Sequence, residues 1–347
     1  MTTSAKRILW EARETRVFSA AAWSIGDHHG PWDHGTIGTV YWDGPEATEG
    51  CYWDLASLTK PIVATAIFSL IEDGLLTLEQ TVGETQTNYA DDGSMITVGQ
   101  LLTHTSGLPG GVPLFRTCSS TDEMLDAVRK LPLSSPPGER CEYSSPGFIL
   151  LGQIAEEVTG QPLNEVVQDR ILRPLGMMDT SFGVPFHERA HAVATENDPW
   201  RGHVVQGEVH DENAKVIGKA AGHAGIFSTL PDMERFAHAV ALASQGEETE
   251  IIGCEAFRLM TSLQTGESKD RWAHGWMIAG DHLHGRSAGT RISSSGFGHT
   301  GFTGTSLWVD PSSGRYSLLL TNRVHPTRHG DSIENVRIRM NDLAFAT

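Results

Sequence analysis

The sequence predicts an α+β fold in which both ends of the chain contribute to one antiparallel sheet and a helical lobe is inserted between them. Three observations support this prediction. Strand-forming segments lie near both termini, helical patterns dominate the middle, and a chain of 347 residues can bury a large core. We expect an α/β lobe from residues 1–90 and 210–347 and a helical lobe from residues 91–209. A cleft between two such lobes is the expected place for a functional site.

The N-terminal part begins with two segments rich in strand-forming residues, 17–25 and 36–42, separated by a polar, glycine-rich stretch. They are predicted to pair antiparallel. A helix then runs from Pro61, whose missing N–H is harmless in a first helical turn, to Gly74, a typical helix stop. Apolar residues recur along it at core spacing: Ile62, Val63, Ala66, Ile67, Leu70 and Ile71.

The middle of the chain has helical periodicity from about residue 98 to residue 176. Helices are expected at 98–102, at 120–131 with Ser120 and Glu123 as a capping box, at 148–158 before Gly160, and at 163–172 before Pro174. Few periodic signals remain from Gly176 to Lys219, and so long a loop in a compact protein usually serves function. We interpret this loop as a wall of the functional site.

The C-terminal segments complete the predicted sheet. A helix is expected at 232–243, followed by a hairpin of residues 298–309 and 316–321 around a turn at 310–314. A last helix at 332–345 places apolar side chains on one stripe, which should cover the sheet: Ile333, Val336, Met340 and Leu343.

Composition limits the kinds of partner. The formal net charge of −17 disfavours nucleic acids and anionic membranes, because both attract clustered Lys and Arg. No segment resembles a signal peptide or has the length of a membrane span, so a cytoplasmic protein is expected. Four cysteines lack metal-ligand spacing and are interpreted as reduced thiols: Cys51, Cys118, Cys141 and Cys254. Neither a metal nor another cofactor is predicted. A small molecule remains as the partner, and the oligomeric state stays open.

The strongest chemical signal is Ser57-x-x-Lys60 at the start of the apolar helix. This spacing places a hydroxyl and an amine on one face of the first turn, as a Ser/Lys nucleophile requires. Backbone N–H groups and the positive end of the helix dipole lie nearby and favour a developing oxyanion. With six lysines in the chain, chance still supplies roughly half a Ser-x-x-Lys match. For this motif alone, an N-cap serine with a solvated lysine is an equal alternative.

The Ser57 hydroxyl becomes a nucleophile only when a base removes its proton. Lys60 takes a proton from Ser57 only when it is uncharged, which requires burial. Tyr143, directly before the helix at 148–158, is a candidate second base that points toward the cleft. A tyrosine at the edge of the core is the alternative for this residue taken alone.

The stretch 298–305 has three glycines among eight residues. Such a density in a strand indicates that another backbone or a ligand approaches closely, or else marks a bulge. We expect an edge strand lining the cleft. His299 and Thr300 should face the substrate, and the N–H of Phe302 should join that of Ser57 in an oxyanion hole.

Ser57-x-x-Lys60, Tyr143-Ser144-Ser145 and His299-Thr300-Gly301 occur in this order along the chain. They resemble the Ser-x-x-Lys, Tyr-x-Asn and Lys/His-Thr-Gly motifs of the serine β-lactamase and penicillin-binding-protein superfamily. The likeness is greatest to its class C-like branch, which contains DD-carboxypeptidases, D-aminopeptidases and family VIII esterases. Four further blocks are similar to that branch, so the resemblance covers nearly the whole chain: residues 101–109, 208–214, 222–228 and 320–326.

The resemblance implies a β-lactamase/transpeptidase-like fold and an acyl-enzyme on Ser57. It implies that Lys60 takes or passes the proton, and that Tyr143 is general base and leaving-group acid. His299 stands in place of the usual lysine, and Ser145 stands where asparagine is common. The implied substrate-binding and oxyanion residues are Ser145, His299, Thr300, Gly301 and Phe302.

The histidine at position 299 bears on the substrate. A lysine is charged at physiological pH and can hold the carboxylate of a β-lactam, whereas a histidine is mostly neutral at pH 7. A hydrolase of carboxylic esters or small amides therefore agrees best with the sequence. The alternatives are a DD-carboxypeptidase or D-aminopeptidase acting on short peptides, a weak β-lactamase, and an acyltransferase. A binding protein of the same fold without turnover is the alternative outside catalysis.

A competing nucleophile lies in Gly285-Arg286-Ser287-Ala288-Gly289, which matches the Gly-x-Ser-x-Gly elbow. Asp310 and His325 follow it in the order of α/β-hydrolases. An elbow needs an apolar strand before it and a helix after it, and neither is predicted here. Ser287 is therefore interpreted as a surface-loop serine.

The remaining polar clusters are interpreted as structural. Histidines in two polar turns lack metal-ligand spacing and are expected to be solvated: His28, His29, His34, His282 and His284. His210-Asp211-Glu212 is expected to brace the long loop, and His104 and His223 to make structural hydrogen bonds.

Overall fold

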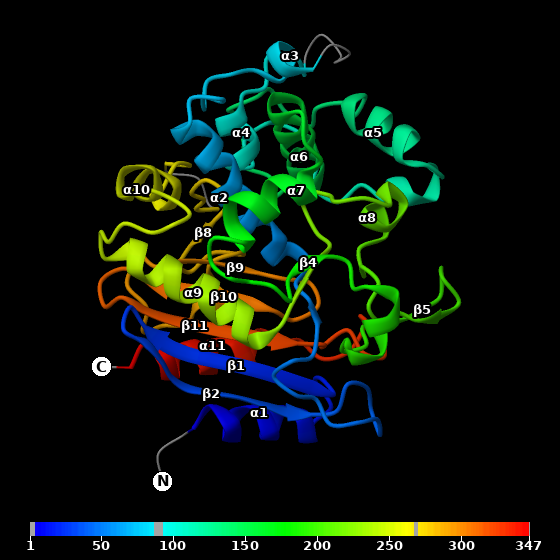
Figure 1. Cartoon of the computed structure of the whole chain (residues 1–347), viewed down its shortest axis with the longest axis vertical. Helices are drawn as coiled ribbons and strands as arrows, with labels where there is room; N and C mark the ends of the chain where they lie inside the picture. Colours follow the sequence, from blue (N-terminus) through cyan, green and yellow to red (C-terminus); the bar gives the residue numbers. More distant parts are fainter. Residues whose placement is uncertain (1–3, 87–92, 267–269, 347) are drawn as a thin grey trace.

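The computed structural model describes residues 4–86, 93–266 and 270–346. Its centre is a six-stranded antiparallel sheet with the order β2-β1-β11-β10-β9-β8. The strands are β1 (Ala20–Asp27), β2 (Gly30–Gly38), β8 (Met277–Ile278), β9 (Phe297–Thr300), β10 (Ser306–Asp310) and β11 (Arg315–Thr321). N-terminal and C-terminal strands therefore lie side by side, and the predicted α+β architecture is confirmed (Figure 1).

Helices cover both faces of this sheet. On one face lie α1 (Ala5–Glu14) and α11 (Glu334–Ala344), and on the other lies α9 (Leu230–Ser244) (Figure 1). The neighbouring inner strands β1 and β11 are buried along almost their whole length, because helices pack on both faces of the sheet. Small residues, Ala20, Ala21 and Ala22, let the layers approach closely in β1.

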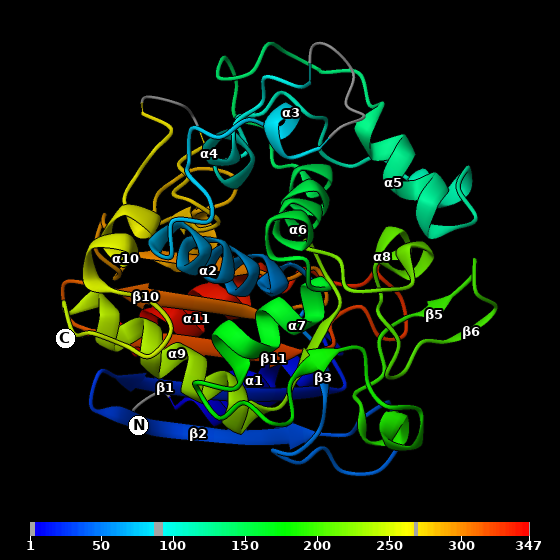
Figure 2. The same cartoon turned by 45° about the horizontal axis from the view of Figure 1, so that its top comes forward.

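The remaining helices form a second layer above α9 and the sheet. Helix α2 (Thr59–Glu72) is buried along most of its length and packs between the sheet lobe and this layer (Figure 2). The other helices are α3 (Val82–Thr85), α4 (Val98–Leu102), α5 (Thr121–Arg129), α6 (Ser145–Thr159), α7 (Leu163–Val167), α8 (Glu212–Ile217) and α10 (Cys254–Thr261). Most lie in the middle of the sequence, as its periodicity predicted. The lobe limits stay a prediction, and the boundary at residue 90 lies outside the described residues.

The predicted strands differ from the observed ones at two places. The second N-terminal strand is β2, at residues 30–38 rather than 36–42, and only a short turn at 28–29 precedes it. Because β2 is the sheet edge and half-exposed, it tolerates the polar residues that suggested a longer turn. The segment 298–309 is two strands, β9 and β10. Between them the N–H of Gly304 donates to the carbonyl of Gly301 at 3.0 Å.

Two helical predictions also need correction. Ser120 caps α5 by accepting from the N–H of Glu123 at 3.3 Å, but the carboxylate of Glu123 accepts from Ser119 rather than closing a capping box. The helix expected at 163–172 is α-helical only to Val167 and continues as a π-helix to Leu172. Helix α1 was not predicted at all.

The long loop from 176 to 219 contains short elements, β4 (Ser181–Phe182), β5 (Asn197–Asp198), β6 (His203–Val204) and α8. Strand β4 pairs with β7 (Ile226–Ser228), which in turn pairs with β3 (Trp53–Asp54). This small sheet ties the loop to the start of α2. Within the described residues, no helix is both long and apolar enough to cross a membrane. The four cysteines are unpaired, as expected.

Buried Asn322 joins three distant segments. Its Oδ1 accepts from the N–H groups of Ser19 and Ala20, both at 3.1 Å. Its Nδ2 donates to Ser19 Oγ at 2.8 Å and to the carbonyl of Ala194 at 2.9 Å. The side chain thus fixes the end of β11 to the start of β1 and to the long loop.

We predict that Asn322→Ala destabilises the protein by about 2–4 kcal/mol, because several buried polar groups lose their partners at once. Equilibrium urea unfolding measures this loss as a lower midpoint with an unchanged slope. Asn335→Ala, at an exposed position of α11, is the matched control and should change stability by less than about 0.5 kcal/mol. Equal stabilities of the two variants would contradict the anchoring role.

Candidate active site

Ser57 lies in a strained turn between β3 and α2. A short 3-10 helix, Ala56–Leu58, begins there, and Ala56 has a positive φ of 48°. The N–H of Ala56 donates to Asp54 Oδ1 at 2.8 Å, and the other oxygen of this buried carboxylate accepts from the N–H of His210 at 2.7 Å. Asp54 therefore holds the turn that presents the Ser57 hydroxyl. No local pattern in the sequence indicates this role of Asp54.

Lys60 is fully buried one helical turn beyond Ser57. Its Nζ donates to Ser57 Oγ at 3.1 Å and to the carbonyl of His223 at 3.0 Å. Burial lowers the pKa of Lys60 to about 7, while the negative charge of Asp211 acts in the opposite direction. A substantial fraction of this amine is thus uncharged at neutral pH, which is the state that accepts a proton from a hydroxyl.

Tyr143 approaches the same hydroxyl from the turn before α6. Lys60 Nζ lies 4.8 Å from the centroid of its ring, and Tyr143 and Ser57 line the same cleft. Burial raises the pKa of Tyr143 well above its ordinary value, so the phenol is protonated at neutral pH. Trp272 stacks on the tyrosine at a centroid separation of 5.4 Å. The fold thus brings Ser57, Lys60 and Tyr143 together.

His104, which packs against this turn, has the structural role expected for it. Nδ1 of buried His104 accepts from the N–H of Ser144 at 3.1 Å, and its ring lies 4.7 Å from that of Tyr143. Ser144 also caps α6. These contacts fix the backbone on both sides of the phenol.

The glycine-rich strand makes the predicted close approach. A Cβ on Gly301 would collide with the carbonyl of Leu55 and the hydroxyl of Thr305, so only glycine fits at this position. Thr303 and Thr305 donate to the carbonyls of Asp54 and Leu55 at 2.8 and 2.9 Å. The end of β9 is thereby fixed against the Ser57 turn.

The predicted edge strand is corrected in one respect. The outermost strand is β8, which pairs with Phe297 and Gly298 of β9. This pairing ends before Thr300, so the half of β9 that reaches the Ser57 turn has no ladder partner on that side among the described residues.

The structure places His299 elsewhere than at the substrate-facing position expected for it. Its side chain is fully buried behind the cleft wall, 6.0 Å from the ring of Tyr143, and does not line the cleft. Burial, followed by the charge of Lys60, holds the pKa of His299 well below its ordinary value. The imidazole is therefore neutral and lies behind Tyr143. Ser145, at the first position of α6, does not line the cleft either.

A cleft of about 410 Å³ opens in front of Ser57. Its lining includes Ser57, Tyr143, Met277, Leu283, His284, Arg286, Ser287, Thr300, Gly301, Phe302, Arg323, Ser332, Glu334 and Arg337. Three of the residues predicted for substrate and oxyanion binding thus face this space, and the ring of Phe302 is half-exposed in it.

Two arginines of this cleft have no carboxylate partner within the described part of the chain. Arg337 donates to the carbonyls of Gly301 and Thr305 at 2.7 and 2.8 Å, and Arg323 donates to that of Phe302 at 2.9 Å. Burial, and then the charge of Arg323, lower the pKa of Arg337 to about 9. Both guanidinium groups stay charged at neutral pH, so the cleft holds uncompensated positive charge.

The sequence did not predict the link between Lys60 and Asp211. His223 Nε2 lies 3.0 Å from Asp211 Oδ1, while the carbonyl of the same histidine accepts from Lys60. Burial alone would raise the pKa of Asp211, but the charge and hydrogen bond of His223, the N–H of Ala214 and the charge of Lys60 together lower it below its ordinary value. Both residues were expected to be structural, and no local pattern connects them with Lys60.

The bracing role expected for the neighbours of Asp211 is observed. His210 Nε2 lies 2.9 Å from Glu196 Oε2, and Glu212 accepts from Arg328 at 2.6 Å. Glu196 also accepts from Arg328 at 2.6 Å. Burial raises the pKa of Glu196, but the hydrogen bonds with His210 and Arg328 and the charge of Arg328 outweigh it and lower this pKa to about 2. The network holds the long loop beside Phe302.

The competing serine is not activated. Ser287 is buried in a 3-10 helix instead of lying on the surface, and no partner of its hydroxyl is found among the described residues. His325 Nδ1 contacts the carbonyl of Thr195, and Asp310 accepts from Ser293 and Ser312. Neither residue reaches Ser287, so no elbow triad is assembled. In the described part, no three His, Cys, Asp or Glu side chains are grouped to hold a metal ion.

A serine hydroxyl hydrogen-bonded to a buried lysine, with a tyrosine in the same cleft, is typical of a serine acyl-transfer enzyme. The sequence profile of the Beta-lactamase family matches residues 13–338. The chain therefore belongs to the β-lactamase family, and it is a serine hydrolase.

Relatives with recorded names agree with this assignment. A provisionally assigned D-alanyl-D-alanine carboxypeptidase of Escherichia coli K12 is 28% identical over 318 residues, covering 83% of this chain and 73% of the relative. The N-acetylmuramyl-L-alanine amidase of Bacillus subtilis 168 is 27% identical over 302 residues, covering 79% and 68%.

Solved structures show the same fold. An octameric penicillin-binding protein homologue from Pyrococcus abyssi has a TM-score of 0.76 at 21% identity, covering 98% of this chain and 76% of its own. The hydrolase EstCE1, described as having promiscuous acyltransferase activity, has a TM-score of 0.79 at 19% identity, covering 99% and 97%. The predicted β-lactamase-like fold is confirmed.

The protonation of Lys60 generates a prediction about pH. If the neutral amine is the active form, kcat/KM for an ester rises as pH passes about 7, the pKa of Lys60. The charge of Asp211 favours protonated Lys60, so Asp211→Asn should lower this pKa and move the rising limb to lower pH. The measurement is the pH profile of kcat/KM in both proteins.

Asp126→Asn is the matched control, because Asp126 is an exposed acid of α5 paired with Lys130. Its profile should coincide with that of the unchanged protein. A rising limb that stays in place in Asp211→Asn, or moves to higher pH, would contradict the electrostatic link.

Proposed function

We propose that this protein hydrolyses a small carboxylic ester or amide through an acyl-enzyme on Ser57. The observation that carries the proposal is the contact of 3.1 Å between Ser57 Oγ and the buried amine of Lys60, whose pKa is lowered to about 7. A serine hydroxyl needs such a base within hydrogen-bonding distance before it attacks a carbonyl carbon.

The proposed acylation begins when Lys60 accepts the proton of Ser57 and Oγ bonds to the carbonyl carbon. The negative charge that develops on the carbonyl oxygen is stabilised by the N–H groups of Ser57 and Phe302. Tyr143, whose phenol is protonated at neutral pH, gives its proton to the leaving alcohol or amine and regains one from Lys60. Water then attacks the acyl group by the same proton transfers in reverse.

The raised pKa of Tyr143 changes the role implied by the family likeness. A phenol that holds its proton is a good acid and a poor base, so Lys60 takes the first proton in our proposal. Neutral His299, buried 6.0 Å from the tyrosine ring, adds no positive charge that would favour a phenolate.

We predict that Ser57→Ala lowers kcat for a short-chain aryl ester at least about 1,000-fold and abolishes covalent labelling by a fluorophosphonate. Ser287→Ala, in the same cleft, should keep both properties nearly unchanged. Intact-protein mass spectrometry with peptide mapping measures the adduct. Labelling that persists in Ser57→Ala and disappears in Ser287→Ala would transfer the nucleophile to Ser287.

A second candidate is cleavage of a short peptide amide whose leaving group carries a carboxylate. Arg323 and Arg337 favour it, because each is half-buried in the cleft without an acidic partner in the described residues. The named carboxypeptidase and amidase relatives support an amide substrate of this kind. The positive charge that His299 does not supply would then come from these two arginines.

We predict that Arg323→Gln raises KM at least about tenfold for an acyl-amino acid with a free carboxylate, because a charge-assisted hydrogen bond is worth about 1.5–3 kcal/mol. KM for the corresponding primary amide should change little. Arg258→Gln, at an exposed position of α10, is the control. Equal losses for the acid and its amide would contradict carboxylate recognition and leave the acyl-enzyme mechanism unaffected.

The acyltransferase alternative uses the same acyl-enzyme. An alcohol resolves it as readily as water does if the cleft favours that acceptor. Adding a short-chain alcohol and measuring the ratio of new ester to free acid separates the two outcomes.

A further inference from the structure

A second cavity of about 430 Å³ lies next to residues 223–225, the segment in which the carbonyl of His223 accepts a hydrogen bond from Lys60. Ala224 and Gly225, the two residues after His223, form part of its wall. It shares no lining residue with the cleft in front of Ser57. Its volume is within the range of small-molecule sites.

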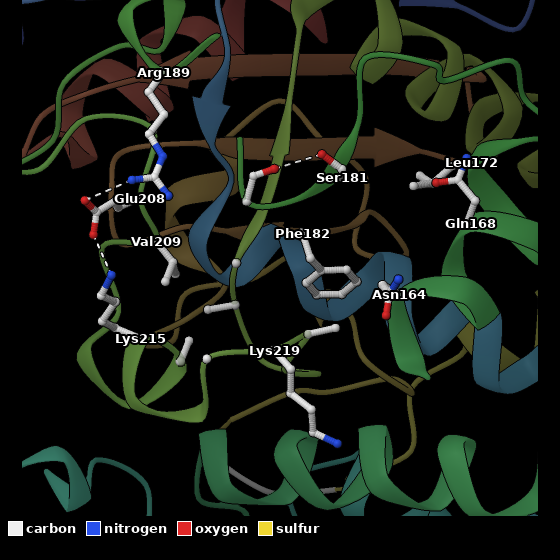
Figure 3. Close-up of a pocket in the computed structure, with 17 residues that line it drawn as sticks. Asn164, Gln168, Leu172, Ser181, Phe182, Arg189, Glu208, Val209, Lys215 and Lys219 are labelled. Carbon is white, nitrogen blue, oxygen red and sulfur yellow. Dashed lines mark hydrogen bonds and ion pairs between the residues drawn. The ribbon is translucent and has the colours of Figure 1, made fainter. Parts of the chain in front are cut away.

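The floor of this cavity is apolar. Phe182 and Val209 lie next to Gly225, where an added Cβ would contact each of them at 3.7 Å. Leu172, Ala214 and Ala220 complete this surface. Figure 3 shows the ring of Phe182 in the middle of the cavity, between two groups of polar side chains.

One polar group consists of Arg189, Glu208 and Lys215. Glu208 accepts from Arg189 Nη1 at 3.2 Å and from Lys215 Nζ at 2.6 Å. Its pKa is lowered first by the hydrogen bond from Lys215, so Glu208 is ionised at neutral pH. One carboxylate therefore neutralises only one of the two cations, and a positive charge remains on this side of the cavity.

The other polar group is a pair of carboxamides. Asn164 and Gln168 lie one helical turn apart, and Figure 3 shows both on the opposite side of Phe182 from Arg189 and Lys215. Within the described residues neither side chain has a hydrogen-bonding partner. Lys219 adds no free charge, because its amine contacts Glu156 at 2.6 Å.

We infer that this cavity is a second binding site, for a small organic carboxylate with an apolar body. The carboxylate would contact Arg189 and Lys215, the body would pack on Phe182 and Val209, and a polar far end would reach Asn164 and Gln168. A positive charge is unusual in a chain with a formal net charge of −17, and an anion neutralises it.

The inference does not depend on the proposed hydrolysis. Binding can be measured in Ser57→Ala, where no acyl-enzyme forms, so the outcome is separate from that of the activity tests. Ala224 and Gly225, which form part of the cavity wall, directly follow His223, whose carbonyl accepts a hydrogen bond from Lys60. A bound ligand would thus lie directly behind the catalytic lysine.

The test is calorimetric titration of Ser57→Ala with phenylacetate and, separately, with phenylacetamide. The two probes have the same shape and differ in charge. We expect saturable binding of phenylacetate and at least tenfold weaker binding of phenylacetamide. Arg189→Gln in the same background should weaken phenylacetate binding at least tenfold, and Lys215→Gln should weaken it as well.

Two controls locate the site. Arg173→Gln removes a nearby exposed cation that pairs with Asp169 outside the cavity and should leave binding unchanged. Arg323→Gln, in the cleft in front of Ser57, should also leave it unchanged. Equal affinity for the two probes, no effect of Arg189→Gln and Lys215→Gln in folded protein, or loss of binding in Arg323→Gln would each overturn the inference.

Discussion

The site depends on the burial of one amine. Lys60 is enclosed by α2, the turn that carries Tyr143 and the segment after α8. Among the described residues, its amine makes polar contacts with a serine hydroxyl and a backbone carbonyl. A charged lysine is costly in such surroundings, because neither contact replaces the water or carboxylate that an ammonium group requires. Burial therefore lowers the pKa of this amine to about 7, and the reactivity that we propose for Ser57 depends on it.

The backbone near Lys60 is strained, and hydrogen bonds hold it in place. Ala56 adopts a positive φ that is unfavourable for a residue with a side chain, and Asp54 holds it by a hydrogen bond to the backbone. The hydroxyls of Thr303 and Thr305 join the turn to the glycine-rich strand, so the two backbones of the predicted oxyanion hole are fixed against each other. Preorganised N–H groups of this kind stabilise developing charge without reorganisation during the reaction.

Charge is distributed unevenly over this acidic protein. Two of its cavities carry positive charge that the neighbouring carboxylates do not fully neutralise, one through Arg323 and Arg337 and the other around Glu208. The two cavities share no lining residue. Local positive charge of this kind attracts anions to both cavities, although the net charge of the protein is negative.

The sequence by itself determined the parts of the site that depend on neighbours along the chain. Spacing on a helix put Ser57 and Lys60 on one face, a turn before α6 carried Tyr143, and glycine density marked the close approach at Gly301. Strands at both termini likewise predicted the shared sheet. Only the tertiary structure decided what surrounds these residues: the burial of His299, the break between β9 and β10, and the contact of Asp211 with His223. Their physical cause is packing between segments far apart in sequence, which sets dielectric surroundings and hydrogen-bond partners that no local pattern encodes.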